Sequence, residues 1–187
     1  KGVPASLFMA ITKTLIKTKA TRGLDAHKVL ERVNEDLSVD NTSFLFVTLF
    51  LGILDVRTGR LQYSNGGHNR PYVLRASGAL ETLAGTDGIA LGAVEDLSYE
   101  SKTVVLERGD VLFLYTDGVT EAMNPAKELY TEARLETELA ARKGHPLKEI
   151  ILALLERIRD FAGGEPQADD ITMLTIQYNG APESPRS

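Results

Sequence analysis

The sequence predicts an α+β fold arranged as a layered sandwich, and three observations lead to this prediction. Apolar residues recur at helical spacing near the beginning of the chain. The middle of the chain consists of short runs rich in β-branched and aromatic residues, separated by turns that contain glycine. After Glu121 the helical period returns, and one last strand-like run follows. Helices and hairpins that are segregated along the chain indicate α+β rather than a doubly wound α/β sheet.

Two helices are predicted at the beginning of the chain. Pro4 suits the first turn of a helix, and we expect this helix over residues 4–18. Asp25 can cap a second helix, in which the apolar residues share one face. The apolar residues are Leu7, Phe8, Ile11, Leu15 and Ile16 in the first helix, and Val29, Leu30, Val33 and Leu37 in the second.

Three hairpins are expected in the middle of the chain, each turning at a polar segment that contains glycine. The residues 85–97 between the second and third hairpins are expected to be irregular. The paired runs are 44–55 with 60–64, 72–75 with 80–83, and 101–106 with 111–115.

The last part of the chain is expected to contain two more helices, at residues 129–142 and 146–161, and a final strand at 171–178. A chain of 187 residues is most simply one domain with a sizeable core. We expect this domain to span residues 1–178 and residues 179–187, rich in Gly, Pro and Ser, to form a loose tail.

The composition argues against several classes of function. With a net charge of −5 and no dense run of Lys or Arg, nucleic acid and anionic membrane surfaces are not expected partners. The absence of cysteine excludes disulfides, thiolate catalysis and Cys-ligated zinc. The 3 histidines are scattered, so any metal is expected to be hard and oxygen-ligated, such as Mg²⁺ or Mn²⁺. No apolar stretch is long enough to span a bilayer and no signal peptide is visible, so we expect a cytoplasmic domain without membrane contact.

Acidic residues occur at two expected strand junctions. Asp117 follows the apolar run 111–115 in an Asp-Gly corner, and Asp169 and Asp170 precede the last strand. Carboxylates on adjacent strand ends can share Mg²⁺ or Mn²⁺, which proteins commonly hold with a few carboxylates and several waters. The alternatives are that the Asp-Gly corner is an ordinary turn, and that Asp169 and Asp170 are solvated loop residues.

A polar, glycine-rich bend at residues 65–71 is the second candidate for a site. Gly66 and Gly67 allow backbone angles that other residues resist. His68 is a candidate proton donor or ligand, with Asn69 beside it. Alternatively, His68 packs and bonds locally, and Asn69 is a turn former.

Four stretches, taken in chain order, resemble the motifs of one enzyme class. Residues 1–9 (KGVPASLFM) resemble the end of a G-D-V-S-G-K-G-V-P-A motif and the helix after it, and residues 64–69 (SNGGHN) resemble N-A-G-H-N. Residues 109–110 (GD) and 114–122 (LYTDGVTEA) nearly match G-D…Y-T-D-G-V-T-E-A, and residues 169–172 match D-D-I-T. Each stretch is weak alone, but in series they resemble the metal-dependent serine/threonine phosphatases of the PPM (type 2C) class. The likeness is to the bacterial branch of the stage II sporulation and sigma-regulator phosphatases.

The resemblance implies two antiparallel sheets flanked by antiparallel helix pairs, with metal ions between the sheet edges. It implies that Asp117 and Asp169 are ligands of Mn²⁺ or Mg²⁺, of which the intact family site holds two. It places Asp170 and Gly118 beside the ligands, and gives His68 and Asn69 a structural or substrate-side role.

The function implied by the resemblance is hydrolysis of phosphoserine or phosphothreonine on a bacterial regulatory protein. The family's usual substrates are anti-anti-sigma factors in partner-switching signal transduction, and a sensory domain is expected upstream in the parent chain. A rival hypothesis is a non-catalytic, phosphatase-like binding module that recognises a phosphorylated partner without turnover.

The sequence departs from the family pattern in two places. The family's bridging Asp and its first strands would precede Lys1, so we expect the 187-residue chain to lack them, to hold one metal ion or none, and to be weakly active or inactive by itself. Sheet edges left exposed in this way invite pairing with a second copy, which predicts a homodimer. Lys127 and Thr131 replace glycines that are usual in the family, which predicts an altered loop there.

Overall fold

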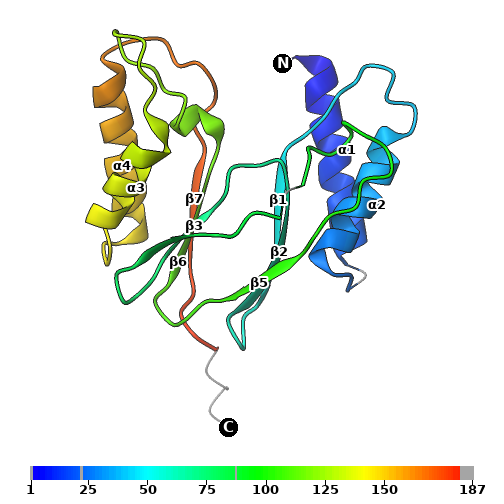
Figure 1. The fold of residues 1–187 in the computed structure, drawn as a ribbon, viewed down its shortest axis with the longest axis horizontal. Helices are drawn as coiled ribbons and strands as arrows, with labels where there is room; N and C mark the ends of the chain where they lie inside the picture. Colours follow the sequence, from blue (N-terminus) through cyan, green and yellow to red (C-terminus); the bar gives the residue numbers. More distant parts are fainter. Residues whose placement is uncertain (1, 22, 87, 182–187) are drawn as a thin grey trace. The chain divides into compact units, whose positions relative to one another are not determined.

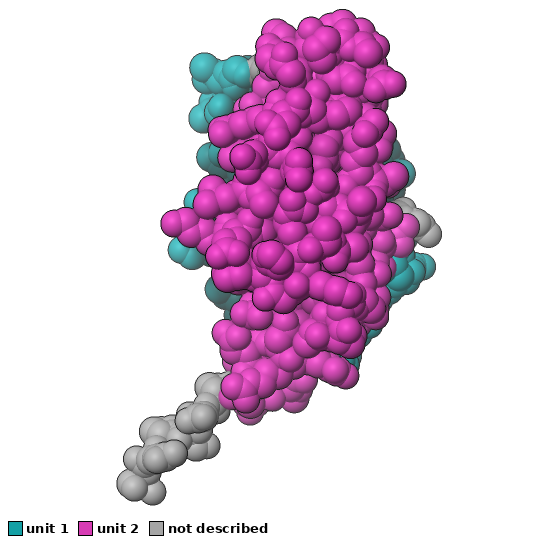
Figure 2. All heavy atoms as spheres, turned by 90° about the vertical axis from the view of Figure 1, so that its left-hand side faces the viewer, with its two compact units in different colours: residues 1–55, 60–68, 84–105 teal, residues 56–59, 69–83, 106–187 magenta. Residues whose placement is uncertain are grey.

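The computed structural model describes residues 2–21, 23–86 and 88–181 (Figure 1). The chain divides into two compact units: residues 1–55, 60–68 and 84–105 form unit 1, and residues 56–59, 69–83 and 106–187 form unit 2 (Figure 2). Each unit contains one antiparallel sheet and one pair of helices, which confirms the predicted α+β class. None of the helices in the described part of the chain combines the length and the apolar character needed to cross a membrane.

Unit 1 consists of α1 (Val3–Ala20), α2 (Ala26–Ser38), β1 (Leu49–Asp55), β2 (Arg60–Gly66) and β5 (Lys102–Val105). Its sheet has the order β1-β2-β5, and α2 packs against both α1 and the sheet (Figure 1). The apolar face predicted for α2 is buried, because Val29, Leu30, Val33 and Leu37 form the core of this unit with Leu91 and Tyr99.

Unit 2 consists of β3 (Tyr72–Leu74), β4 (Leu80–Thr82), β6 (Val111–Tyr115), the short 3₁₀ helix η1 (Asp117–Val119), α3 (Thr131–Ala141), α4 (Leu147–Ala162) and β7 (Met173–Gln177). Its sheet has the order β4-β3-β6-β7. The core lies between this sheet and the helix pair, and Phe113 of β6, Leu135 of α3 and Leu154 of α4 are completely buried in it. The Asp-Gly corner that follows Tyr115 is therefore attached to a buried central strand of the sheet.

The pairing of β6 with β7 decides which loops meet. The strands are antiparallel and Tyr115 pairs with Met173, so the end of β6 lies beside the beginning of β7. The Asp-Gly corner and the Asp169-Asp170 pair consequently lie at the same end of the sheet, as the sequence predicted for adjacent strand ends.

The third predicted hairpin is wrong. β5 pairs with β2, whereas β6 pairs with β3 and β7, so residues 101–106 and 111–115 belong to different sheets. The connection between them is fixed by Asp110, which is only 1% exposed. The Asp110 carboxylate accepts hydrogen bonds from the backbone N–H groups of Ala76 and Glu107 and from the Arg75 guanidinium, all of which lie in unit 2. The turn residues thus fix the start of β6 instead of closing a hairpin.

Two local predictions also need correction. The strand expected from residue 44 begins only at Leu49. The Asn41 side chain bonds both the backbone N–H and the backbone carbonyl of Leu45, and Phe44 has a φ of 51°, so this segment is not extended. Asp25 occupies the cap position of α2, but its carboxylate makes no capping hydrogen bond. The backbone N–H groups of Ala26 and His27, at the start of α2, instead donate hydrogen bonds to the side chains of Gln62 and Ser101.

The altered loop expected after the Asp-Gly corner carries backbone strain. Lys127 has a φ of 64° and Thr131 a φ of 70°. Side chains other than glycine rarely adopt this left-handed conformation, and a β-branched residue such as threonine adopts it least readily. Both residues that replace the family's usual glycines therefore occupy backbone conformations that suit glycine.

Candidate metal and phosphate site

The Asp-Gly corner is a tight turn at the end of β6. The Asp117 side chain is exposed, and its Oδ1 accepts a hydrogen bond from the Gly118 N–H at 2.9 Å. The Asp117 carbonyl accepts the Glu121 N–H at 2.8 Å, which closes the turn. The turn presents a carboxylate to solvent directly after a buried strand.

Thr116 joins this corner to the segment that carries the other two acidic residues. Its backbone N–H donates to the Thr172 carbonyl at 3.0 Å, and its Oγ1 donates to the Asp170 carbonyl at 2.8 Å. The Thr172 N–H in turn donates to Thr116 Oγ1 at 3.0 Å. Three hydrogen bonds through one residue therefore hold the two loops together beyond the last strand pair.

Gly118 lies against the backbone of the same segment. A Cβ atom on Gly118 would lie 2.5 Å from the Asp170 carbonyl oxygen and 2.8 Å from that of Asp169, closer than real Cβ atoms come. The φ of Gly118 is outside the left-handed region, so backbone conformation does not require glycine here. The close approach of the other backbone does, because it leaves no room for a Cβ atom. This contact places the Asp117 turn directly beside Asp169 and Asp170.

The loop before β7 is also ordered by its own side chains. Asp169 Oδ1 accepts the Asp170 N–H at 2.9 Å, and Gln167 Nε2 donates to the Asp169 carbonyl at 2.7 Å. Asp169 is partly buried, and Asp170 is exposed. The corner thus carries three acidic residues, Asp117, Asp169 and Asp170, on two segments whose backbones are in contact.

The donor set suits a hard divalent cation, since it offers carboxylate and carbonyl oxygens and no sulfur or imidazole. Among the residues that the structure describes, no group of three or more acidic or histidine side chains is close enough to form a complete metal site by itself. A cation held here by Asp117 and Asp169 would therefore complete its coordination mainly with water, as Mg²⁺ commonly does.

The buried tyrosines Tyr72 of β3 and Tyr115 of β6 stack on each other close to the end of β6. Burial raises the pKa of Tyr115 to about 12, and the charge of Glu132 adds to the shift, whereas the interactions of Tyr115 with Tyr72 and Asn69 act in the opposite direction. Burial also raises the pKa of Tyr72, whose hydroxyl donates to Glu136 Oε1 at 3.0 Å. These hydroxyls stay protonated at neutral pH, and the Asn69 side chain is placed at the strand end that leads to Asp117.

Residues 65–68 of the glycine-rich bend, which include His68, belong to unit 1. Asn65 clamps this bend, because its Oδ1 accepts the His68 N–H at 2.7 Å and its Nδ2 donates to the His68 carbonyl at 2.8 Å. Gly67 has a φ of 73°, and a Cβ on Gly66 would lie 2.4 Å from a methyl group of Leu91. His68 is in unit 1, whereas Asn69 is in unit 2, where its side chain interacts with Tyr115 at the end of β6.

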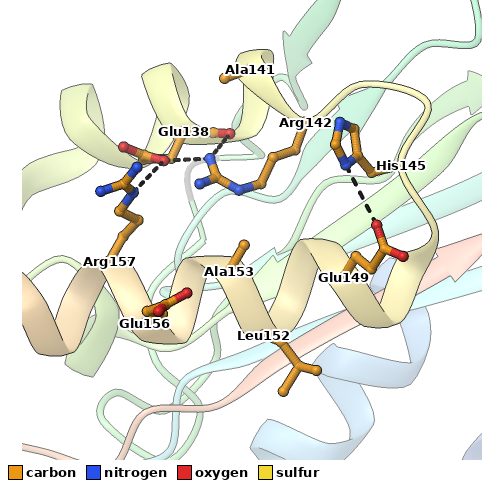
Figure 3. A pocket seen from close by; sticks show the side chains of 9 residues that line it. All are labelled: Glu138, Ala141, Arg142, His145, Glu149, Leu152, Ala153, Glu156 and Arg157. Carbon is orange, nitrogen blue, oxygen red and sulfur yellow. Dashed lines mark hydrogen bonds and ion pairs between the residues drawn. The ribbon is translucent and has the colours of Figure 1, made fainter.

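A hollow of about 650 Å³ lies between α3 and α4 (Figure 3). Figure 3 shows Arg142 and Arg157 directed toward Glu138, and His145 toward Glu149. Because these charges pair with one another and none of the predicted site residues lines the hollow, we do not assign the function to it.

Sequence reasoning assigned no role to Thr116, Thr172 and Gln167, which fix the acidic segments. The sequence does carry one signal for Thr116. It is a polar residue between the apolar strand and the Asp-Gly corner, and a polar side chain in such a position needs a hydrogen-bond partner.

Comparison with known structures defines the class of fold. The PP2C domain of SiaA from Pseudomonas aeruginosa superposes with a TM-score of 0.81 at 22% identity, covering 95% of this chain and 71% of that one. RsbX, solved in complex with magnesium, has a TM-score of 0.68 at 19% identity, covering 94% of this chain and 74% of that one. The fold is therefore that of PP2C phosphatase domains, and magnesium occurs in a structural neighbour.

The sequence comparisons narrow this class to a family. The chain belongs to the stage II sporulation protein E (SpoIIE) family, whose sequence model matches residues 1–179. It is 28% identical over 206 residues to protein IcfG of Synechocystis sp., covering 96% of this chain and 32% of that protein. It is 24% identical over 180 residues to the phosphoserine phosphatase RsbU of Bacillus subtilis, covering 95% of this chain and 52% of that protein. The chain thus spans about a third and about half of the lengths of these two relatives.

Proposed function

We propose that this chain forms the catalytic domain of a divalent-metal-dependent phosphatase that acts on phosphoserine or phosphothreonine in a bacterial regulatory protein. The observation that carries the proposal is the joined corner in which Thr116 and Gly118 hold Asp117 against the Asp169-Asp170 segment. Membership of the SpoIIE family and the similarity to a phosphoserine phosphatase support the same chemistry.

In the proposed reaction a water oxygen bonds to phosphorus, the bond from phosphorus to the serine oxygen breaks, and the serine oxygen leaves with a proton. Asp117 and Asp169 hold Mn²⁺ or Mg²⁺, with Asp170 and Gly118 beside them. The cation supplies positive charge for the phosphoryl oxygens and a more acidic water. Thr116 fixes the relative positions of the two segments, which matters because phosphoryl transfer depends mainly on positioning and electrostatics.

The substrate that we propose is a phosphorylated anti-anti-sigma factor. The support is the likeness of four sequence motifs to the sigma-regulator phosphatases, together with the similarity to RsbU. His68 and Asn69 are proposed on the substrate side of the site, and Asn69 interacts with Tyr115, the last residue of β6, two residues before Asp117.

The experiment measures phosphate released from a phosphoserine peptide with Mn²⁺, with Mg²⁺ and with EDTA, for residues 1–187 and for the chain extended upstream. We expect Mn²⁺-dependent release that is stronger in the extended chain and is abolished by Asp117→Asn. Asp160→Asn, an exposed carboxylate on α4, is the matched control and should leave the rate unchanged. Absence of release from both chains, with phosphopeptide binding retained, would instead establish the non-catalytic binding module.

A further inference from the structure

A small cavity of about 210 Å³ lies in unit 2 between α4 and the two acidic segments. Its walls include residues that follow Asp117 and residues on both sides of Asp169. They are Ala122 and Met123 after the Asp-Gly corner, Gln167 and Ile171 around the acidic pair, and Ile158 and Ala162 from α4.

Most of the residues that line this cavity are apolar, and Arg159, Glu165 and Gln167 complete the lining together with Gly164. Ala122 and Ile158 are buried, and Met123, Ala162 and Ile171 are partly buried around it. Transfer of an apolar group from water to such a surface is favourable. The volume is below the range of about 300–1,000 Å³ that suits a whole small-molecule ligand, so it fits a single side chain better.

Residues on both sides of Asp169 and Asp170 line the cavity, which therefore lies near the acidic corner. Gln167 lines it and donates to the Asp169 carbonyl at 2.7 Å. Ile171 lines it and is two residues from Asp169, a separation that spans at most about 7 Å even in extended chain. A peptide whose phosphate is held at the corner therefore passes the cavity within a few residues.

The charges at the cavity also suit a phosphorylated segment. Glu165 accepts Lys127 Nζ at 2.7 Å, which offsets the negative charge on this side. Arg159 is exposed and lines the same cavity. The positive charge of Arg159 favours a negatively charged partner and helps to orient it.

We propose that this cavity binds an apolar side chain of the substrate protein, located about two to four residues from the phosphoserine. The proposal rests on the proposed phosphatase function and adds a requirement on the sequence of the substrate. The cavity selects segments in which a leucine, isoleucine or methionine accompanies the phosphorylated residue.

The test uses two fluorescent phosphoserine peptides that differ only in carrying leucine or serine at positions two to four from the phosphoserine. Hydrolysis with Mn²⁺ gives kcat and KM, and fluorescence anisotropy gives Kd for the same peptides. Ala162→Leu fills the cavity. Ala153→Leu is the matched control, because Ala153 lies on the same helix but lines the separate hollow between α3 and α4 (Figure 3). Turnover of p-nitrophenyl phosphate, which has no flanking residues, reports on the acidic corner alone.

We expect the leucine peptide to bind at least about tenfold more tightly, seen in Kd and KM, because one apolar side chain supplies discrimination of this size. A162L should remove the preference and leave p-nitrophenyl phosphate turnover unchanged, whereas A153L should keep both. Equal binding of the two peptides, or equal effects of A162L and A153L, would overturn the proposal. If A162L lowers the urea midpoint, the more flexible A162M repeats the test.

Failure of the phosphatase function has a different signature. In that case no substrate releases phosphate, p-nitrophenyl phosphate included. The anisotropy measurements still test whether the cavity binds the apolar side chain. A preference for the leucine peptide that A162L removes supports the cavity, and the absence of any preference refutes it.

Discussion

Replacement of Gly118 by alanine tests the close contact that brings the two acidic segments together. The new Cβ would lie 2.5 Å from the Asp170 carbonyl oxygen, so the segments must separate by at least about 0.5 Å to reach the shortest tolerated contact. The clash is with backbone atoms, which cannot turn aside as a flexible side chain can. Overpacking of this kind costs about 1–3 kcal/mol. Separation also weakens the Thr116–Asp170 hydrogen bond, which is worth about 1 kcal/mol.

We therefore expect G118A to lower the free energy of unfolding by about 2–4 kcal/mol and to weaken Mn²⁺ binding. Urea unfolding and calorimetric Mn²⁺ titration measure the two effects. Gly52→Ala is the control, since the Gly52 φ is also outside the left-handed region and its added Cβ meets only side chains, the nearest at 3.0 Å. Unchanged stability and unchanged Mn²⁺ affinity in G118A would refute the close approach of the two segments.

Three further predictions concern single residues of unit 2. Asp110→Asn leaves the Arg75 guanidinium without its buried partner and should cost about 3 kcal/mol in urea unfolding. Burial alone would raise the pKa of Asp110, but hydrogen bonds from Ala76, Glu107 and Arg75 lower it overall. Its stabilisation is therefore present above the unfolded pKa of about 4 and is lost as pH falls below it, so the acid branch of the stability profile should flatten in D110N; an unchanged branch would contradict this role. Thr131→Gly relieves left-handed strain and should raise stability by about 1 kcal/mol; a loss of stability would show that the threonine is not strained. Thr116→Val removes two hydrogen bonds between the acidic segments and should cost about 2 kcal/mol, with weaker Mn²⁺ binding; the same substitution at exposed Thr137 on α3 is the control.

The helices and most strands could be predicted because their signals are local. The apolar residues of α2 repeat at 3.6-residue spacing, and the strand β6 is a continuous apolar run, so each can be read without its neighbours. Strand pairing is not local. The short turn at residues 108–110 looks like a hairpin, but Asp110 holds the start of β6 beside Arg75 and Ala76, which are 35 and 34 positions away, and β5 pairs with β2.

The acidic corner was predictable only in part, because some of its signals are local and others are not. Asp117 and Asp169 stand out as acidic residues at strand ends, and the order of the motifs suggested that the ends are adjacent. The role of Gly118 as a contact surface depends on how closely another backbone approaches it, and no sequence pattern specifies that distance. The caps of α2 by Gln62 and Ser101 were missed similarly, since their partners are 36 and 74 residues away along the chain.

Calorimetric titration with Mn²⁺ tests most directly the claim that Asp117 and Asp169 together hold a divalent cation. The titration compares the unsubstituted 187-residue chain with Asp117→Asn, Asp169→Asn and the double variant at one pH and ionic strength. Asp160→Asn is the control. Because both carboxylates would bind one ion, we expect each single variant to lose at least about tenfold in affinity and the double variant to lose little more. An affinity in the Asp117→Asn and Asp169→Asn variants equal to that of the unsubstituted chain would contradict the assignment.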